Sequence, residues 1–273
     1  MIIVNNNSTD GTRLFLDQWE EICKAPFEKI VIHTESNFGG AGGFYIGEKK
    51  ALELDSDWVF VADDDAYPHK DMIEKFYEYE STHDCSNVSA ICSAVYEMNG
   101  SVALYHRYNS KIRGFNVMSS YVSLENYEKE SFEFDLLTYV GPFINANALK
   151  KVGLINPRYF IYSDDTEHSM RLKKYGKLIC VPSIKIEHEG ILSKIDGNSE
   201  DVSWREYYSL RNHLNTMKRH HILVFIYCFL AQFRRLYLTK RDNPKRKHLL
   251  KTALWNSIFN KLGIHDVYKP GWK

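Results

Sequence analysis

The amino-acid sequence predicts an α/β fold in which a mostly parallel, doubly wound sheet is flanked by helices and followed by a basic helical tail. Short apolar runs alternate with amphipathic helical segments over residues 1–80, and turns rich in Asn, Asp and Gly separate them. Such alternation is typical of parallel sheets whose loops gather at the carboxyl ends of the strands. A change in the sign of the charge near residue 201 sets the tail apart.

The first part of the chain supplies three expected strands and three expected helices. Strands are predicted where an apolar run is short and bounded by turn residues, over Met1–Val4, Lys29–Thr34 and Trp58–Ala62. Helices are predicted where apolar residues recur with helical spacing, over Thr12–Cys23, from the glycine cluster to Leu54, and over Pro68–Glu80. Proline is tolerated in the first turn of the last of these helices.

The rest of the main domain is predicted to be less regular. Residues 88–143 are rich in β-type segments with turns at Asn99-Gly100 and Arg113-Gly114, which suits an insertion over the edge of the sheet. Further along the chain we expect helices and one short strand. The helices are Asn147–Val152, Asp164–Tyr175 and Ser203–His220, and the strand is Lys185–Glu189.

The net charge of zero conceals two oppositely charged regions. Residues 1–201 hold 20 Lys and Arg against 32 Asp and Glu, whereas residues 202–273 hold 15 against 3. A length of 273 residues suits one elaborated α/β domain with an appendage. We therefore expect a main domain over residues 1–201 and a basic helical region over residues 202–273. Such a region commonly binds phosphate, in anionic lipid head groups or in nucleic acid.

The basic region also contains an apolar run, Ile222–Leu230, that is too short to cross a bilayer. It could lie in a membrane interface while the cations that follow contact lipid head groups, or it could pack on the main domain. These cations are Arg234, Arg235, Lys240, Arg241, Lys245, Arg246 and Lys247. The five cysteines are odd in number and form no C-x-x-C pair, which suggests free thiols and a cytoplasmic protein. Docking of the tail on anionic lipids would make the protein peripheral at the inner face of the plasma membrane.

Three consecutive aspartates, Asp63, Asp64 and Asp65, follow the apolar run that ends at Ala62. Carboxylates crowded at the end of a strand repel one another unless a cation joins them, and that cation could in turn bind a diphosphate. A solvated loop, or a cap on the following helix, would explain the triplet equally well. A calcium loop is excluded, because it requires an acid or amide at Tyr67 and glycine at Pro68.

The glycine-rich segment Asn37–Gly43 comes directly after a predicted strand and opens a helix, so its backbone amides could approach a ligand closely. It matches G-x-G-x-x-G in no register, which disfavours a dinucleotide-dependent oxidoreductase. A tight connection between strand and helix is the alternative interpretation.

His188 and the segment Ser163–Glu167 are the remaining candidates. Two carboxylates with one imidazole suit Mn²⁺ or Mg²⁺, although a lone histidine is more often structural. In Ser163–Glu167, Asp164 as the N-cap and Glu167 three residues later would form a capping box. The alternative is a general base presented at the start of a helix.

Taken in order, these segments resemble family-two GT-A glycosyltransferases: Val4–Thr12, Asn37–Phe44, Asp63–Asp65, Tyr159–Glu167 and His188. The N-F-G-G-A-G-G-F stretch is similar to bacterial galactofuranosyl- and rhamnosyltransferases of cell-surface polysaccharide assembly. The resemblance implies a GT-A fold and an inverting, metal-dependent transfer. The donor would be of the UDP-galactofuranose or dTDP-rhamnose type, and the acceptor a saccharide or a polyprenyl-linked saccharide.

Carried over position by position, the resemblance assigns roles to residues of this chain. Asp63 and Asp65 would contact the metal and the donor, and His188 would complete a Mn²⁺ or Mg²⁺ site. Asp165, or as a second choice Asp164, would deprotonate the acceptor hydroxyl. The other donor-binding residues would be Asn5, Asp10, Asn37, Gly39, Gly40, Asp64 and Arg211, the last from a Y-Y-x-x-R-N element.

The sequence departs from the family pattern in two places. Asn5 stands where the family usually carries Asp. The family also normally begins one strand and one helix upstream, and that first strand is central in the sheet. Without this unit we expect two exposed sheet edges and a chain of marginal stability on its own.

Two other functions are compatible with parts of the sequence. A non-catalytic nucleotide-sugar-binding or scaffold protein would not need the retained Asp63, Asp65, Asp165 and His188, which favours the enzyme. No recognised nucleic-acid-binding motif accompanies the basic tail, so we expect no nucleic-acid partner.

Overall fold

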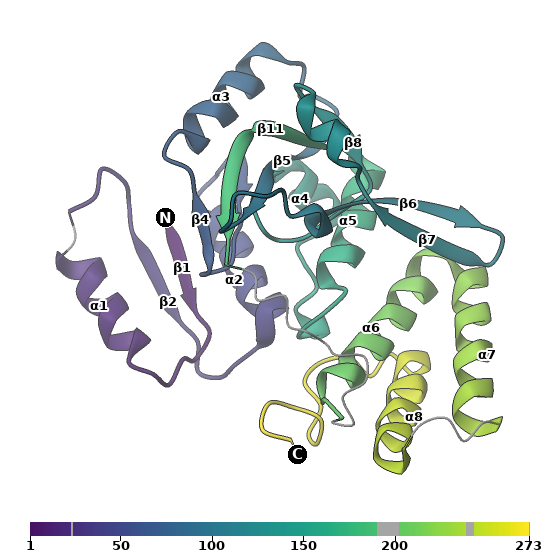
Figure 1. Cartoon of the computed structure of the whole chain (residues 1–273). Helices are drawn as coiled ribbons and strands as arrows, with labels where there is room; N and C mark the ends of the chain where they lie inside the picture. Colours follow the sequence, from purple (N-terminus) through teal and green to yellow (C-terminus); the bar gives the residue numbers. More distant parts are fainter. Residues whose placement is uncertain (23, 190–201, 239–242, 273) are drawn as a thin grey trace.

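A computed structural model describes residues 1–22, 24–189, 202–238 and 243–272. The described strands form three sheets (Figure 1). Two strands pair in parallel at the N-terminus, β1 (Ile2–Asn5) and β2 (Ile30–His33). The main sheet has the order β3 (Trp58–Phe60), β10 (Pro142–Asn145), β5 (Val88–Glu97), β11 (Lys177–His188) and β4 (Ala66–Pro68), with β8 (Phe132–Phe134) also paired to β11. The third sheet contains β7 (Asn116–Tyr121), β6 (Arg107–Arg113) and β9 (Leu136–Leu137).

Eight α-helices lie within the described residues (Figure 1). They are α1 (Thr12–Ile22), α2 (Gly39–Glu53), α3 (Met72–Thr82), α4 (Ala146–Val152), α5 (Asp164–Tyr175), α6 (Arg205–His220), α7 (Ile222–Leu238) and α8 (Pro244–Ile258). Short 3₁₀ turns cover Leu104–His106, Leu124–Glu128 and Pro157–Tyr159. The predicted alternation of strands and helices over the first 80 residues is confirmed, as is the helical character of the described tail.

The prediction of a mostly parallel sheet is wrong for the main sheet. Only β5 and β11 pair in parallel there, while β10 is antiparallel to both β3 and β5, and β11 is antiparallel to β4 and β8. Antiparallel neighbours need no crossover helix between them. The segment that connects β5 to β10 can therefore form β strands in place of a crossover helix, and β10 lies next to β5 in the sheet.

The prediction that residues 88–143 form an insertion over the sheet edge is correct only for the hairpin β6–β7. Strand β5 and strand β10 lie inside the main sheet, and β5 is buried from Val88 to Val95 on both of its faces. Ser89 and Ser93 interrupt the apolar run of β5, but their hydroxyls donate to the carbonyls of Leu172 and Gly141, at 2.7 Å each. These bonds allow polar residues in a central strand.

Pro68 lies in β4 and not at the start of a helix, which corrects a second boundary. Residues Ala66–Pro68 pair with Ile186–His188 of β11, and α3 begins only at Met72. Strand β4 is at the edge of the main sheet, where a proline without an N–H group is tolerated. The predicted short strand at Lys185–Glu189 is the end of the longer β11.

The main sheet is buried between two layers of helices. Helices α2, α4 and α5 contribute to a cluster on one side that includes Ala51, Leu149 and Leu172. Helix α3 covers the other side, where the ring of Phe76 stacks on that of Phe143 at 4.0 Å. The predicted acidic triplet Asp63–Asp65 lies between the end of β3 at Phe60 and the start of β4 at Ala66.

A buried polar network ties α2 to the rest of the domain. The Glu48 carboxylate accepts a hydrogen bond from the Tyr139 hydroxyl at 2.6 Å and another from the backbone N–H of Ile155 at 2.8 Å. The Tyr139 hydroxyl also contacts His168 of α5. Burial raises the pKa of Glu48 to about 7 and lowers the pKa of His168 to about 3. The network therefore holds the two helices together without relying on a strong ion pair.

The three tail helices pack on one another around a core of leucines. This core includes Leu214, Leu236, Leu249 and Leu254, and Phe160 of the main domain packs into it. No helix among the described residues is both long and apolar enough to cross a membrane. Cys85, Cys92, Cys180 and Cys228 carry free thiols. Cys23 and the tail cations Lys240 and Arg241 lie outside the described residues.

We expect Glu48→Ala to destabilise the protein by about 3 kcal/mol, because it leaves two buried donors without acceptors, at about 1–3 kcal/mol each. The matched control is Glu53→Ala in the same helix, where an exposed carboxylate faces Lys50 at 3.6 Å. That change should cost less than about 0.5 kcal/mol. Urea denaturation of both variants measures the difference, and equal midpoints would contradict the role given to Glu48.

Candidate active site

Backbone pairing at the edge of the main sheet places Asp65 beside His188. His188 is opposite Ala66 in the β11–β4 ladder, and the N–H of Glu189 donates to the carbonyl of Asp65 at 2.9 Å. The Nε2 atom of His188 lies 3.2 Å from Oδ1 of Asp65. One ligand atom from each of Asp63, Asp65 and His188 lies within 4.8 Å of the others. The three predicted metal ligands, Asp63, Asp65 and His188, thus lie close together.

The chemistry of this cluster fits a divalent cation. Oδ1 of Asp65 and Nδ1 of His188 are buried and have no hydrogen-bond partner among the described residues. Loss of hydration raises the pKa of Asp63 to about 6, and the charge of Asp65 adds to the rise while His188 opposes it. Carboxylates that raise one another's pKa gain most when a cation neutralises them. Two carboxylates with one imidazole suit Mn²⁺ or Mg²⁺ better than a structural zinc site.

A segment that the sequence analysis did not single out packs behind this cluster. The ring of His106 lies edge-on to that of His188, with 5.1 Å between their centres. Burial lowers the pKa of His106 well below its ordinary value, so this ring is neutral at pH 7. Nδ1 of His106 is 2.6 Å from the Thr138 hydroxyl. Its partners come from residues far apart in the chain, so no local sequence pattern could have identified the contact.

Asp164 and Asp165 form the first turn of α5, but not as the predicted capping box. The N-cap position belongs to Ser163, which has φ of 61° and makes no side-chain cap bond. Asp164 already lies inside the helix. Glu167 points away from the helix start and is bound by Arg171 at 2.9 Å and by His220 at 3.2 Å. Although burial opposes the effect, these partners lower the pKa of Glu167 to about 2. The cap prediction for Asp164 is therefore wrong.

The two adjacent aspartates differ in their surroundings. Oδ1 of Asp165 accepts hydrogen bonds from the N–H of Thr166 at 2.6 Å and from its hydroxyl at 3.2 Å. Burial raises the pKa of Asp165, and these bonds oppose the rise. Burial also raises the pKa of Asp164, and the charge of Asp165 raises it further. The charge of Asp165 therefore favours the protonated form of Asp164.

Electrostatic contact joins this pair to the acidic cluster. The charge of Asp165 contributes to the raised pKa of Asp63, and the charge of Asp63 contributes to that of Asp164. Asp64 has the same effect on Asp63. The two groups of carboxylates are thus close enough to raise one another's pKa, although about a hundred residues separate them in the chain.

The glycine-rich segment opens α2 at Gly39, and asparagine side chains fix its shape. Oδ1 of Asn37 accepts from the N–H of Gly39 at 2.8 Å, and Asn6 bonds to the N–H of Phe38 and the carbonyl of Gly39 at 2.9 and 2.8 Å. Gly39 has φ of +73°, and a Cβ there would lie 2.0 Å from the carbonyl oxygen of Phe160. A Cβ on Gly40 would meet nothing within 4 Å, so this residue faces open space. Asn6 was not predicted as a site residue, because its partners lie some thirty residues later in the chain.

Asn5 and Asp10 use their side chains within the protein. Asn5 is buried and bonds to Nδ1 of His33 at 2.9 Å and to the N–H of Ser8 at 3.0 Å. Asp10 is exposed and accepts from the N–H and the hydroxyl of Thr12, at 3.2 and 2.6 Å. These bonds shape the turn after β1 and the start of α1. They do not bring either side chain to the acidic cluster.

Arg211, a predicted donor-binding residue, uses its side chain within the protein. Only 1% of it is exposed, and its guanidinium donates to the carbonyls of Gly263 at 2.6 Å and Tyr159 at 3.1 Å. The same group lies over the rings of Tyr207 and Tyr208. The Y-Y-x-x-R-N element is thus packed inside the protein, and the guanidinium is directed to buried carbonyls.

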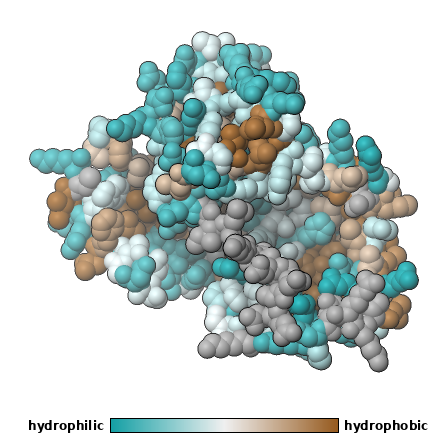
Figure 2. All heavy atoms as spheres, in the orientation of Figure 1, coloured by the Kyte–Doolittle hydropathy of each residue, from teal (hydrophilic) through white to brown (hydrophobic). Residues whose placement is uncertain are grey.

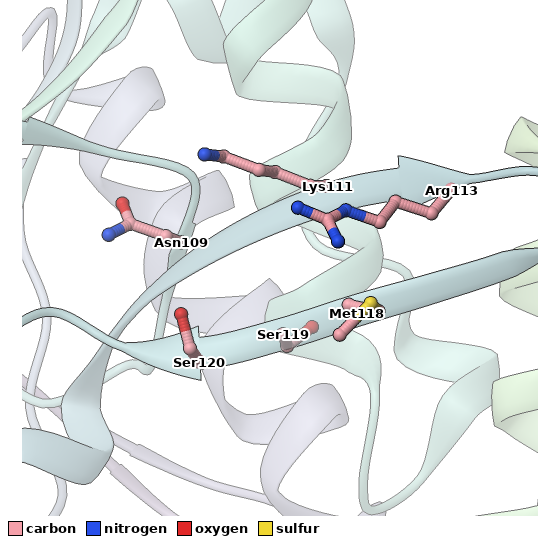
Figure 3. Close-up of a pocket in the computed structure, with 6 residues that line it drawn as sticks. All are labelled: Asn109, Lys111, Arg113, Met118, Ser119 and Ser120. Carbon is pink, nitrogen blue, oxygen red and sulfur yellow. The ribbon is translucent and has the colours of Figure 1, made fainter.

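A separate hollow of about 260 Å³ lies along the β6–β7 hairpin (Figure 3). It is lined by Asn109, Lys111 and Arg113 of β6 and by Met118, Ser119 and Ser120 of β7. Figure 3 shows the side chains of Lys111 and Arg113 extending in the same direction from β6. None of the predicted site residues lines this hollow.

Curated proteins and solved structures with known roles resemble this chain. Galactofuranosyltransferase GlfT1 of Mycolicibacterium smegmatis is 26% identical over 182 residues, which cover 64% of this chain and 56% of the relative. GlfT1 of Mycobacterium tuberculosis is 22% identical over 293 residues, covering 99% and 88%. The putative teichuronic acid biosynthesis glycosyltransferase TuaG of Bacillus subtilis is 39% identical over 88 residues, or 32% of each chain.

The crystal structure of GalNAc-T7 with UDP, GalNAc and Mn²⁺ superposes with a TM-score of 0.61 at 11% identity, covering 94% of this chain and 49% of that one. The chain thus spans about half the length of GalNAc-T7 and of the M. smegmatis relative. At this identity the superposition shows the fold alone, and the fold is GT-A. The family model described as glycosyl transferase family 2 matches residues 1–143. The chain therefore belongs to glycosyl transferase family 2.

Proposed function

We propose that this glycosyltransferase is metal-dependent and inverting, and that it transfers a sugar from a nucleoside-diphosphate donor to a saccharide or lipid-linked acceptor. The observation that carries the proposal is the cluster of Asp63, Asp65 and His188, whose ligand atoms lie within 4.8 Å of one another. The second group of carboxylates, Asp164 and Asp165, is close enough to this cluster for the charges to raise one another's pKa. A displacement at a sugar carbon requires one group that stabilises the leaving diphosphate and another that takes the acceptor proton.

Asp63, Asp65 and His188 would hold a Mn²⁺ or Mg²⁺ ion. When bound, such an ion supplies positive charge that stabilises the departing diphosphate. Oδ1 of Asp65 and Nδ1 of His188 support this role, because both are buried and lack a hydrogen-bond partner among the described residues. GalNAc-T7, which shares the fold, was crystallised with Mn²⁺, and this supports a divalent metal here.

The donor would lie between the acidic cluster and the glycine-rich segment. Asp64 is exposed beside the cluster, and Gly40 faces open space at the start of α2, where backbone N–H groups favour a phosphate. Asn37 shapes that segment through its bond to Gly39. The likeness to GlfT1 favours UDP-galactofuranose, with a dTDP-rhamnose type of donor as the alternative. The likeness to TuaG supports a role in cell-surface polysaccharide synthesis.

Asp165 is the proposed catalytic base. The acceptor oxygen attacks the anomeric carbon on the face opposite the diphosphate, the bond to the diphosphate breaks, and the hydroxyl proton passes to the Asp165 carboxylate. The hydrogen bonds from Thr166 stabilise the charged form of Asp165, and that charge favours the protonated form of Asp164. A single displacement of this kind inverts the anomeric configuration.

The tail would place the enzyme on an anionic membrane surface, near a lipid-linked acceptor. Helix α7 exposes an apolar face that consists of Ile222, Leu223, Ile226, Tyr227 and Leu230. Figure 2 shows hydrophobic residues over this part of the molecule. Phe115 at the tip of the β6–β7 hairpin stacks on Tyr227 and is itself exposed, so it extends the apolar surface. The surplus of cations over residues 202–273 complements anionic lipid head groups.

UDP or dTDP should raise the melting temperature only when a divalent cation is present, because the cluster binds the diphosphate through the metal. A thermal-shift panel of UDP, dTDP and GDP, each with Mn²⁺ or with EDTA, measures this. Asp65→Asn should abolish the metal-dependent part. Asp64→Asn removes the same charge one residue away and should keep Mn²⁺ binding. Equal stabilisation in excess EDTA would refute the metal site.

Asp165→Asn should lower the rate of transfer by about 10²- to 10⁴-fold, the usual effect of removing a general base. Donor binding and melting temperature should stay close to those of the parent protein. Asp164→Asn should retain most of the activity, since Asn is neutral like the protonated carboxyl it replaces. Transfer assays with both variants decide the assignment. The reverse pattern would make Asp164 the base, and a product of retained configuration would refute the mechanism.

Vesicles of anionic phosphatidylglycerol should sediment the intact protein, whereas neutral phosphatidylcholine vesicles should not. The double substitution of Leu223 and Ile226 by Glu should abolish this binding, because it places charges on the apolar face of α7. The control is Ile73→Glu on α3, where the residue is similarly exposed. If the intact protein does not sediment with anionic vesicles, α7 has only the role of packing against the other tail helices.

A further inference from the structure

The segment Tyr159–Ser163, which leads directly into Asp164 and Asp165, has an unusual backbone. Phe160, Tyr162 and Ser163 have φ of 68°, 67° and 61°, in the left-handed region that favours glycine. Such conformations cost about 1–3 kcal/mol each and persist only where the surroundings fix them. Three of them within four residues require strong external support.

Two neighbouring side chains of α6 provide this support. Nδ2 of Asn212 donates to the carbonyls of Tyr159, Ile161 and Tyr162, at 2.9, 2.8 and 2.9 Å. Arg211 donates from Nη2 to the carbonyl of Tyr159 at 3.1 Å and from Nε to Oδ1 of Asn212 at 2.8 Å. The exposed fractions of Arg211 and Asn212 are 1% and 0%. The Tyr159 carbonyl also accepts from the N–H of Ile161 at 2.9 Å. The carbonyls of Ile161 and Tyr162 are satisfied by Asn212, from a helix about fifty residues later in the chain.

The supported segment touches both parts of the proposed active site. The Phe160 carbonyl accepts from the N–H of Ala41 at 3.3 Å and fills the space where a side chain on Gly39 would be. At its other end, the Ser163 carbonyl accepts from the N–H of Glu167 at 2.9 Å and so starts α5. The conformation of this segment therefore sets the direction of the first turn of α5 relative to the glycine-rich segment.

We propose that Arg211 and Asn212 are positioning residues for the transfer reaction, which hold Tyr159–Ser163 in its irregular backbone conformation and so orient Asp165 toward the acceptor. The inference rests on the proposed role of Asp165. It gives a physical function to the Y-Y-x-x-R-N element: Tyr207 and Tyr208 stack against the Arg211 guanidinium, and Arg211 in turn fixes the Asn212 amide. Neither side chain touches the substrate.

Asn215 offers a matched control on the same helix. It is as buried as Arg211, with an exposed fraction of 1%. It bonds to the Tyr159 side-chain hydroxyl at 3.1 Å and to Asn260 at 2.9 Å, but to none of the carbonyls of Tyr159–Ser163. Asn215→Ala should therefore cost stability without releasing the backbone of the segment.

The experiment compares Asn212→Ala, Arg211→Lys and Asn215→Ala for kcat, for the Kd of UDP with Mn²⁺, and for melting temperature. Asn212→Ala should lower kcat by about 10²-fold, the cost of misplacing a reacting group by about 1 Å. Its Kd for UDP should change less than about threefold, since the metal cluster lies at the β4–β11 edge of the main sheet. Arg211→Lys, which keeps one donor, should fall between Asn212→Ala and the parent. Asn215→Ala should lower the melting temperature but keep kcat within about twofold.

Hydrogen exchange gives a second readout that does not depend on activity. The amides of residues 160–167 should exchange faster in Asn212→Ala than in the parent protein, and Asn215→Ala should leave them unchanged. If Asn212→Ala does not fold, Arg211→Lys carries the same comparison. Equal kcat in Asn212→Ala and Asn215→Ala, or unchanged exchange over residues 160–167, would overturn the inference. A parent protein that neither binds UDP with Mn²⁺ nor transfers sugar would refute the proposed function instead, and the exchange data would still test whether Asn212 holds the segment.

Discussion

The candidate site depends first on the position of β11. This strand pairs with β5, β4 and β8, and its last residue, His188, stands beside the residue that follows Asp65. Ile184 and Ile186 are fully buried on it, so a slip by one residue would turn these side chains outward. Backbone pairing and side-chain burial thus bring His188 to the aspartates. No hydrogen bond from another side chain is needed, and the ligand atoms are left available.

The sequence predicted features that depend on neighbouring residues better than features that depend on residues far apart in the chain. The strands and helices of residues 1–80 follow from local periodicity and turn residues, and their order was confirmed by the structure. The central places of β5 and β10 follow from pairing between residues about fifty apart, such as Phe143 with Ile91. Ser93 interrupts the apolar pattern of β5 in the sequence, but in the structure its hydroxyl donates a hydrogen bond to the Gly141 carbonyl. Local patterns contain no information on such a partner.

The same limit applies to the predicted site residues. Asp63, Asp65 and His188 were predicted together because the resemblance to family-two glycosyltransferases assigns them to one metal site, and the structure brings them together. Arg211 was assigned to the donor because it is polar and lies in a motif, but its N–H groups bind carbonyls of the protein itself. A polar residue that satisfies an irregular backbone and one that binds a ligand look alike in a sequence. Only the three-dimensional contacts distinguish them.

The two halves of the candidate site are therefore held by different forces. Asp65 and His188, two of the proposed metal ligands, are fixed by a regular backbone ladder, in which each pairing supports the next. Asp165, the proposed base, follows a strained segment that has no ladder of its own and relies on buried polar side chains of α6. Helix α6 belongs to the basic region, which differs from the main domain in charge. Its Leu214 nevertheless packs in the same core as Phe160 of the main domain, and its Asn212 donates hydrogen bonds to three carbonyls of the main domain. A boundary between residues 201 and 202 consequently divides the chain by charge but not by packing.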